Sequence, residues 1–116
     1  MTFRFGPHQR LRNRVGFDAV YATRRSRRVG PLLVFVRHGA SSDGPRLGLS
    51  LPKRVGNAVT RNRIRRCLRE AFRLQQQEWS RGVDVVVNVR PHQPLVMEEY
   101  AAFLREARLA LLRPPT

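Results

Sequence analysis

The side chains best suited to chemistry in this sequence are the guanidinium groups concentrated in residues 53–73. At about 100° per residue, a helix through this segment collects five arginines on one side. They are Arg61, Arg65, Arg66, Arg69 and Arg73. Glu70 is the only acidic residue in the segment, and like charges four residues apart destabilise a helix. The pattern therefore predicts a helix surface that an anionic partner faces.

Two further features of this segment favour RNA as that partner. Asn62 lies among the arginines, and its amide suits ribose 2′-hydroxyls or base edges, which phosphate alone would not require. Lys53, Arg54 and Gly56 precede the helix and increase the density of charge. A solvated basic face is the alternative interpretation, and this density weighs against it. The opposite side is expected to face the core through Ile64, Cys67, Leu68, Ala71, Phe72 and Leu74.

The composition also indicates a polyanionic partner. Of 116 residues, 23 are Lys or Arg and 8 are Asp or Glu, which gives a formal net charge of +15. Such an excess repels itself unless a polyanion neutralises it, so nucleic acid is the first candidate and a membrane surface the second. Lys53 is the only lysine, and the arginines fork onto phosphates and stack on bases. Genomic base composition would explain the same arginine bias equally well.

The elements that must position this surface follow from periodicity and turn residues. Helices are expected at residues 15–21, from Ala58 to about Trp79 with Asn57 or Thr60 as the N-cap, and at residues 97–112. Strands are expected at residues 32–36, 46–51 and 83–89, and the first two should pair as a hairpin. Residues 24–28 are expected to form an exposed basic loop that ends at Gly30 and Pro31.

The element order α-β-β-α-β-α predicts an α/β (α+β) two-layer sandwich. Its small sheet should carry the helices on one face, which leaves the other face free to hold a ligand. With 41% hydrophobic residues, residues 1–116 are expected to form a single RNA-binding domain. Residues 1–13 should be a flexible basic arm and residues 113–116 a tail.

Several function classes are disfavoured by what the sequence lacks. Cys67 is the only cysteine, and the three histidines are scattered, so no disulfide and no metal site are expected. The acids are dispersed, and the adjacent Glu98 and Glu99 suit the first turn of a helix, so no catalytic residue is expected. No apolar run approaches the roughly 20 residues that span a bilayer. No secretory signal is visible either, so a cytoplasmic protein without a membrane or small-molecule partner is expected.

Residues 53–66 closely resemble the RNR signature of bacterial ribonuclease P protein components, with the core Arg61, Asn62 and Arg63. The resemblance extends over roughly residues 10–112 and includes the Leu47-Gly48-Leu49-Ser50 strand. It implies the accessory subunit of an endoribonuclease that matures the 5′ ends of tRNA precursors. It also implies a mixed sheet with a left-handed crossover around the signature helix, against the usual right-handed preference.

The resemblance assigns two binding sites. It places the contacts with the catalytic RNA at Lys53, Arg54, Asn57, Arg61, Asn62, Arg63, Arg65 and Arg66. Arg69 is added to this set because it lies on the same side of the predicted helix. It places the 5′ leader of precursor tRNA in a cleft on the free sheet face, lined by Phe17, Tyr21 and Phe35. Aromatic faces stack on any base, although aromatic residues are more often part of a core.

The partners that follow are a catalytic RNA and precursor tRNA, and the chemistry is assigned to the RNA. Mg²⁺ would be held by the RNA and the substrate rather than by the protein. A structural ribosomal protein that binds rRNA is the main alternative, since it would share the charge and size. A DNA-binding regulator is less favoured, because no second helix with a tight turn precedes the arginine helix.

Overall fold

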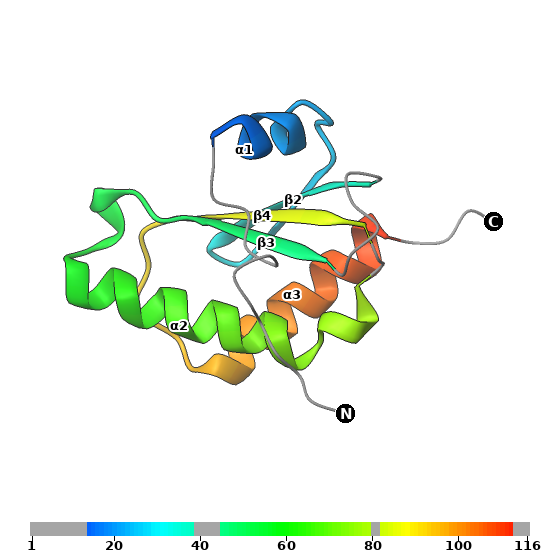
Figure 1. The fold of residues 1–116 in the computed structure, drawn as a ribbon. Helices are drawn as coiled ribbons and strands as arrows, with labels where there is room; N and C mark the ends of the chain where they lie inside the picture. The colour runs from blue at the N-terminus through cyan, green and yellow to red at the C-terminus, as the bar shows by residue number, and fades with distance from the viewer. Residues whose placement is uncertain (1–13, 39–44, 80–81, 113–116) are drawn as a thin grey trace.

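The computed structural model describes residues 14–38, 45–79 and 82–112, and the expected basic arm and tail lie outside these residues. Its elements follow one another in the order shown in Figure 1. They are α1 (Arg14–Tyr21), β1 (Ser26–Val29), β2 (Leu32–Arg37), β3 (Arg46–Ser50), the 3-10 helix η2 (Lys53–Val55), α2 (Ala58–Leu74), the 3-10 helix η3 (Gln76–Glu78), β4 (Asp84–Val89) and α3 (Met97–Leu111). The expected strands and helices on β2, β3, β4, α1 and α3 are therefore confirmed to within two residues at each end.

The four strands form one mixed sheet in the order β1-β2-β4-β3. β4 is antiparallel to β2 and parallel to β3, with Val87 opposite both Val34 and Leu49. The predicted hairpin of β2 with β3 is wrong, because β4 lies between them. Val85, Val86 and Val87 are fully buried on both faces of the sheet, and a strand that is apolar on both faces belongs at the centre.

The loop expected at residues 24–28 is also wrong in part. Ser26–Val29 forms β1, which pairs with β2 through a tight turn at Gly30 and Pro31. Gly30 has a φ of 55°, and a Cβ there would lie 2.5 Å from Cζ of Phe103. β1 is an edge strand whose first three side chains are exposed, so it shows no apolar alternation that sequence reasoning could detect.

The helices pack on both faces of the sheet, as Figure 1 shows. α2 and α3 cover one face and enclose the main core around Ile64, Phe72 and Tyr100. α1 lies on the other face, where Val20 packs on Val86. The α+β class and the mixed sheet are confirmed, but the expectation of all helices on one face is wrong for α1. Periodicity shows that a helix has an apolar side, and not which sheet face covers it.

α2 begins as predicted and ends earlier. Asn57 is its N-cap, and the side-chain Oδ1 accepts a hydrogen bond of 2.8 Å from the backbone N–H of Thr60. The helix stops at Leu74, which is 50% exposed rather than in the core, and η3 then follows. This turn brings Trp79 onto Phe72, with ring centroids 5.5 Å apart.

The parallel strands β3 and β4 are connected through α2, which is the crossover that the resemblance implies. Its handedness stays a prediction from the resemblance. Among the helices in the described ranges, none has the length and apolar character needed to cross a membrane.

Candidate nucleic-acid interface

The arginine-bearing side of α2 is fixed by the residues on its opposite side. Ile64, Leu68, Ala71 and Phe72 are completely buried against the sheet and α3. Because a helix turns by about 100° per residue, this anchoring forces the remaining positions outward. The nine residues predicted to bind the catalytic RNA all lie on η2, the N-cap or α2, and together they form what we call the α2 basic surface. They are Lys53, Arg54, Asn57, Arg61, Asn62, Arg63, Arg65, Arg66 and Arg69.

None of these nine side chains is buried. Six are exposed, and Arg61, Arg65 and Arg69 are half-buried along the helix. Arg63 lies at the border nearest α3, where it acts on Tyr100. Burial raises the pKa of Tyr100, and the charge of Arg63 acts in the opposite direction. The α2 basic surface therefore extends from the N-cap around the outer side of the helix to the edge of α3.

Four arginines of the α2 basic surface keep uncompensated charges within the described residues. Arg61 Nε donates to the carbonyl oxygen of Gly56 at 3.1 Å, and Arg65 Nη1 donates to Asn62 Oδ1. Both acceptors are neutral. Within residues 14–38, 45–79 and 82–112, no carboxylate pairs with Arg61, Arg63, Arg65 or Arg66.

The acid of α2 is engaged elsewhere. Glu70 accepts hydrogen bonds from Arg73 Nε at 2.5 Å and Nη2 at 3.2 Å, near the C-terminal end of the helix. This bond raises the pKa of Arg73. Arg73, which the sequence places on the same side as the other arginines, is thus neutralised, whereas the N-terminal half of α2 keeps its excess of positive charge.

Gly56 shapes the start of the α2 basic surface. A Cβ at this position would lie 2.9 Å from Cγ2 of Thr60, which is closer than side chains tolerate. The absence of a side chain therefore lets η2 fold tightly against the first turn of α2. As a result, Lys53 and Arg54 are held next to the helical arginines.

The three aromatic residues predicted to bind the leader come together on the sheet face that α1 covers, and we call them the aromatic cluster. Their rings meet edge to face, with centroids 6.3 Å apart for Phe17 and Tyr21 and 4.9 Å apart for Tyr21 and Phe35. All three are half-buried against Val20 and Val86. They are therefore neither fully in the core nor fully exposed, and their role in binding the leader stays a prediction.

Tyr21 connects the aromatic cluster to the beginning of the α2 basic surface. Its hydroxyl donates to Oδ1 of Asn88 at 2.7 Å, and burial raises its pKa. Asn88 of β4 lies opposite Ser50 of β3, which is also within hydrogen-bonding reach of Tyr21. Lys53 follows Ser50 by three residues, so the two predicted sites adjoin at the end of β3.

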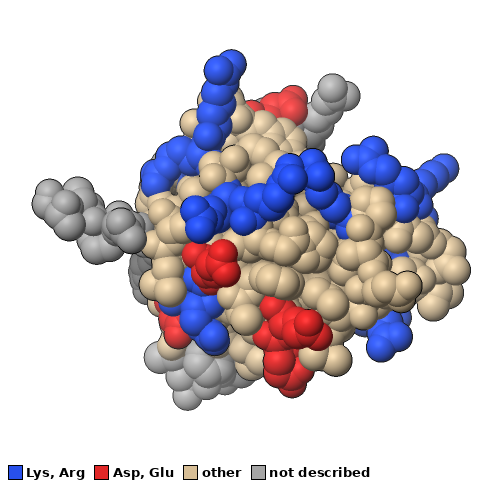
Figure 2. Space-filling model, turned by 180° about the vertical axis from the view of Figure 1, so that it is seen from behind, with Lys and Arg blue, Asp and Glu red and all other residues tan. Residues whose placement is uncertain are grey.

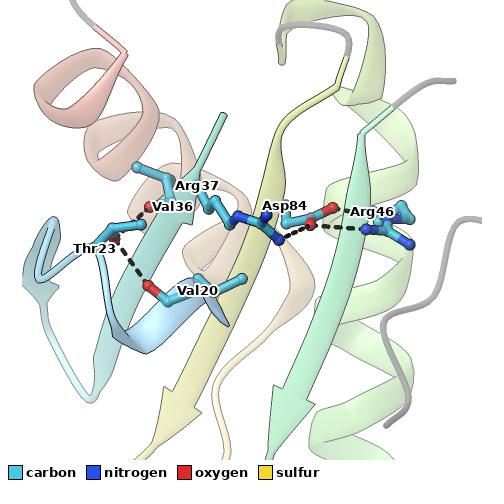
Figure 3. A network of polar contacts seen from close by, with 6 residues as sticks. All are labelled: Val20, Thr23, Val36, Arg37, Arg46 and Asp84. Atoms are coloured by element: carbon cyan, nitrogen blue, oxygen red, sulfur yellow. Dashed lines mark hydrogen bonds and ion pairs between the residues drawn. The ribbon is translucent and has the colours of Figure 1, made fainter. Parts of the chain in front are cut away.

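A buried carboxylate on the same sheet face was missed by sequence reasoning (Figure 3). Asp84 is 1% exposed and accepts hydrogen bonds from Arg46 Nε at 2.7 Å and Nη2 at 2.8 Å. Arg37 Nη1 lies 3.9 Å from the same carboxylate. The register places these residues side by side at the ends of β2, β4 and β3. The only sequence signal was an acid at the start of an apolar strand, which says nothing about its partners.

Thr23 fixes α1 on the sheet next to this network. Its Oγ1 lies 2.8 Å from the carbonyl oxygen of Val20 at the end of α1 and 2.9 Å from that of Val36 in β2 (Figure 3). The two carbonyl oxygens share the hydroxyl of Thr23 as their donor, and these contacts connect α1 to β2. Phe17 and Tyr21 are thereby held over Phe35.

The donors needed for a protein-bound metal ion do not converge in the described part of the chain. No group of three His, Cys, Asp or Glu side chains is close enough there to hold an ion. His92 has a packing role, since its ring nitrogens lie 2.7 Å from the carbonyl oxygen of Arg90 and 2.7 Å from the hydroxyl of Tyr100.

Fold and surface together define an α+β protein that presents an arginine-rich helix from a four-stranded mixed sheet. A family model described as Ribonuclease P matches residues 5–113. The chain belongs to this ribonuclease P protein family, which serves tRNA processing.

Individual relatives agree with the family model. The ribonuclease P protein component of Desulfovibrio desulfuricans is 37% identical over 105 residues, which cover 90% of this chain and 80% of the relative. That of Oleidesulfovibrio alaskensis is 39% identical over 113 residues, with 90% of each chain covered.

Solved structures agree as well. The RNase P protein from Thermotoga maritima has a TM-score of 0.74 and 26% identity, and the match covers 92% of this chain and 98% of that protein. A Staphylococcus aureus RNase P protein mutant with defective mRNA degradation activity has a TM-score of 0.78 and 25% identity over 89% of this chain and 87% of the mutant. The resemblance stated from the sequence is confirmed.

Proposed function

We propose that the chain is the protein subunit of a ribonuclease P ribonucleoprotein in the cytoplasm, and that its α2 basic surface binds the catalytic RNA. The observation that carries this proposal is a group of four arginines on α2 that no carboxylate compensates within the described residues, namely Arg61, Arg63, Arg65 and Arg66. Such charges repel one another, and phosphates of a folded RNA relieve that repulsion. Asn57 is committed to the helix cap, so Asn62 is the amide better placed to meet a 2′-hydroxyl or base edge.

The aromatic cluster is proposed to hold the single-stranded 5′ leader of precursor tRNA. Phe17, Tyr21 and Phe35 are half-buried and rigidly packed, so each keeps part of its surface available for stacking on a base. Stacking accepts any base, which suits leaders of different sequence. The adjoining Lys53 would meet the leader backbone where it passes toward the catalytic RNA.

The cleavage chemistry is proposed to belong to the RNA. Phosphodiester hydrolysis with Mg²⁺ needs oxygen ligands that converge on the ion, and the described residues offer no such group of carboxylates. Asp84, the buried acid of the sheet, already binds Arg46 and Arg37. The protein would therefore bind and position RNA, while the RNA and the substrate hold Mg²⁺. The family comparisons do not favour the alternative of a structural ribosomal protein.

Reconstitution tests this proposal. The purified chain is added to a ribonuclease P RNA at low Mg²⁺, and release of the leader from a precursor tRNA is followed. The native chain should restore cleavage, the variant R63Q/R66Q should restore it only at higher protein concentration, and R105Q on α3 should match the native chain. Cleavage that is independent of the added protein, or an equal effect of all three proteins, would contradict the proposal.

A further inference from the structure

A second group of arginines lies at the edge of the sheet opposite β3. Arg24, Arg25, Arg27 and Arg28 fall within five consecutive residues, and all four side chains are exposed. We call them the β1 basic edge. β1 is the outermost strand on its side and contacts α3, whereas α2 contacts β3 at the other edge. The β1 basic edge is thus separate from the α2 basic surface.

The strand geometry spreads two of these arginines to either side of the edge. Arg27 lies opposite Val34, whose side chain enters the main core, and Arg28 lies opposite Leu33, which faces the α1 side. Successive side chains of a strand point to opposite faces, so the two guanidinium groups straddle the edge. In the described residues neither group has a carboxylate partner.

The other two arginines have structural constraints that Arg27 and Arg28 lack. Arg25 Nη2 donates to the carbonyl oxygen of Leu111, which joins the start of the edge to the end of α3. Arg24 has a φ of 56°, in the left-handed region. Arg25 therefore connects the edge to α3, and Arg27 and Arg28 are the side chains best placed to meet a partner.

The surface charges are unevenly distributed. Figure 2 shows a band of Lys and Arg side chains across one face of the molecule, with most of the Asp and Glu side chains in this view below the band. The exposed acids of α3 include Glu98, Glu99 and Glu106. Charged residues commonly protect edge strands from pairing with other chains. Protection alone leaves the charges of Arg27 and Arg28 without an anionic partner, and a bound polyanion would supply one.

We propose that the β1 basic edge is a second RNA-binding surface, which contacts phosphates of an RNA segment other than the one bound by α2. The proposal rests on the proposed function, because that function brings the RNA. β1 and β3 are separated by two intervening strands, roughly 14 Å at the usual spacing, so one backbone running along α2 does not also reach β1. The edge offers guanidinium groups, which bind phosphates, without aromatic rings or amides beside them. The phosphates belong either to the catalytic RNA or to the precursor tRNA.

The experiment measures how affinity depends on salt for the full chain and for R27Q/R28Q. One arm titrates a ribonuclease P RNA with protein, and the other titrates the assembled holoenzyme with precursor tRNA. The slope of log affinity against log salt is negative. Loss of two phosphate contacts should make it less steep by about 1.4 to 1.8. Between 50 and 200 mM salt, the native chain should then lose about ninefold more affinity than the variant. The arm that shows this change identifies the RNA.

Three controls make the outcome decisive. R27K/R28K keeps both charges and should keep the native slope, while R105Q removes one exposed charge from α3 and should leave the slope nearly unchanged. Hydroxyl-radical footprints should show that R27Q/R28Q exposes nucleotides different from those exposed by R63Q/R66Q. Native slopes for R27Q/R28Q in both arms would overturn the inference. A normal slope for R63Q/R66Q together with a reduced slope for R27Q/R28Q would instead overturn the assignment of α2 and leave the β1 basic edge standing.

Discussion

Neutralising two arginines of the α2 basic surface should weaken RNA binding without weakening the fold. Arg63 and Arg66 are the best positions, because both are exposed and neither has a hydrogen bond or ion pair within the described residues. If the surface contacts about six phosphates, the native slope of log affinity against log salt is about −5.4. Affinity then falls on the order of 10³-fold between 50 and 200 mM salt, and about 10²-fold for R63Q/R66Q.

The folding stability of R63Q/R66Q should stay the same or rise slightly, although its affinity for RNA falls. Arg63 and Arg66 are three residues apart, as are Arg66 and Arg69, and each like-charge pair at this spacing costs roughly 0.2–0.5 kcal/mol. Glutamine is a good helix former, so R63Q/R66Q should unfold at the same or a slightly higher temperature than the native chain. Filter binding across a salt series and thermal denaturation by circular dichroism measure the two effects.

The control is R105Q, which removes one exposed charge from α3 and is compared with the single variant R66Q. R66Q should make the negative slope of log affinity against log salt less steep by about 0.9, and R105Q should leave it unchanged. A salt-independent affinity of the native chain would refute the electrostatic reasoning. So would a fall in melting temperature for R63Q/R66Q large enough to account for its weaker binding.

Three further predictions concern the sheet and its aromatic residues. D84N removes the charged acceptor of Arg46 and should lower the free energy of unfolding by about 2 kcal/mol in urea denaturation, whereas E106Q at the exposed surface of α3 should have little effect. Y21A should weaken binding of precursor tRNA by about 1–3 kcal/mol and leave binding of mature tRNA unchanged. Y21F keeps the aromatic ring and should bind precursor tRNA like the native chain. Equal losses of affinity for precursor and mature tRNA would contradict the assignment of the leader to the aromatic cluster. Burial raises the pKa of Tyr21 and of Tyr100 above the ordinary value of 10.0. The stability that this shift contributes is therefore fully present below about pH 10, and it is lost as the pH rises through the pKa values of the folded protein. Tyrosinate absorbance should therefore titrate at higher pH in the native chain than in urea, and identical titrations would show that the rings are solvated.

Sequence reasoning succeeded where one segment contains its own evidence. Asn57 and the buried positions Ile64, Leu68 and Phe72 lie within one helix, so their spacing already specified the side of α2 that faces the core. β4 was recognisable for a similar reason, since four of its six residues are valines. The α2 basic surface could be predicted because all its residues belong to this single stretch of chain.

The same reasoning failed where a decision depends on a distant segment. The pairing of β2 with β3 was expected from proximity along the chain, yet β4 takes the place between them. β1 was mistaken for a loop because an exposed edge strand has no apolar pattern. The partners of Asp84 come from two other strands, and no local signal connects them to it.

By itself, the sequence determined the identity of most helices and strands, the arginine face of α2 and the family to which the chain belongs. These features depend on periodicity and on motifs within a single segment. Only the tertiary structure decided the strand order, the placement of α1 on the second face of the sheet, the aromatic cluster built from α1 and β2, and the isolation of the β1 basic edge. Each of these features depends on which distant segments bury one another, and that competition is settled by packing of the whole chain rather than by any local pattern.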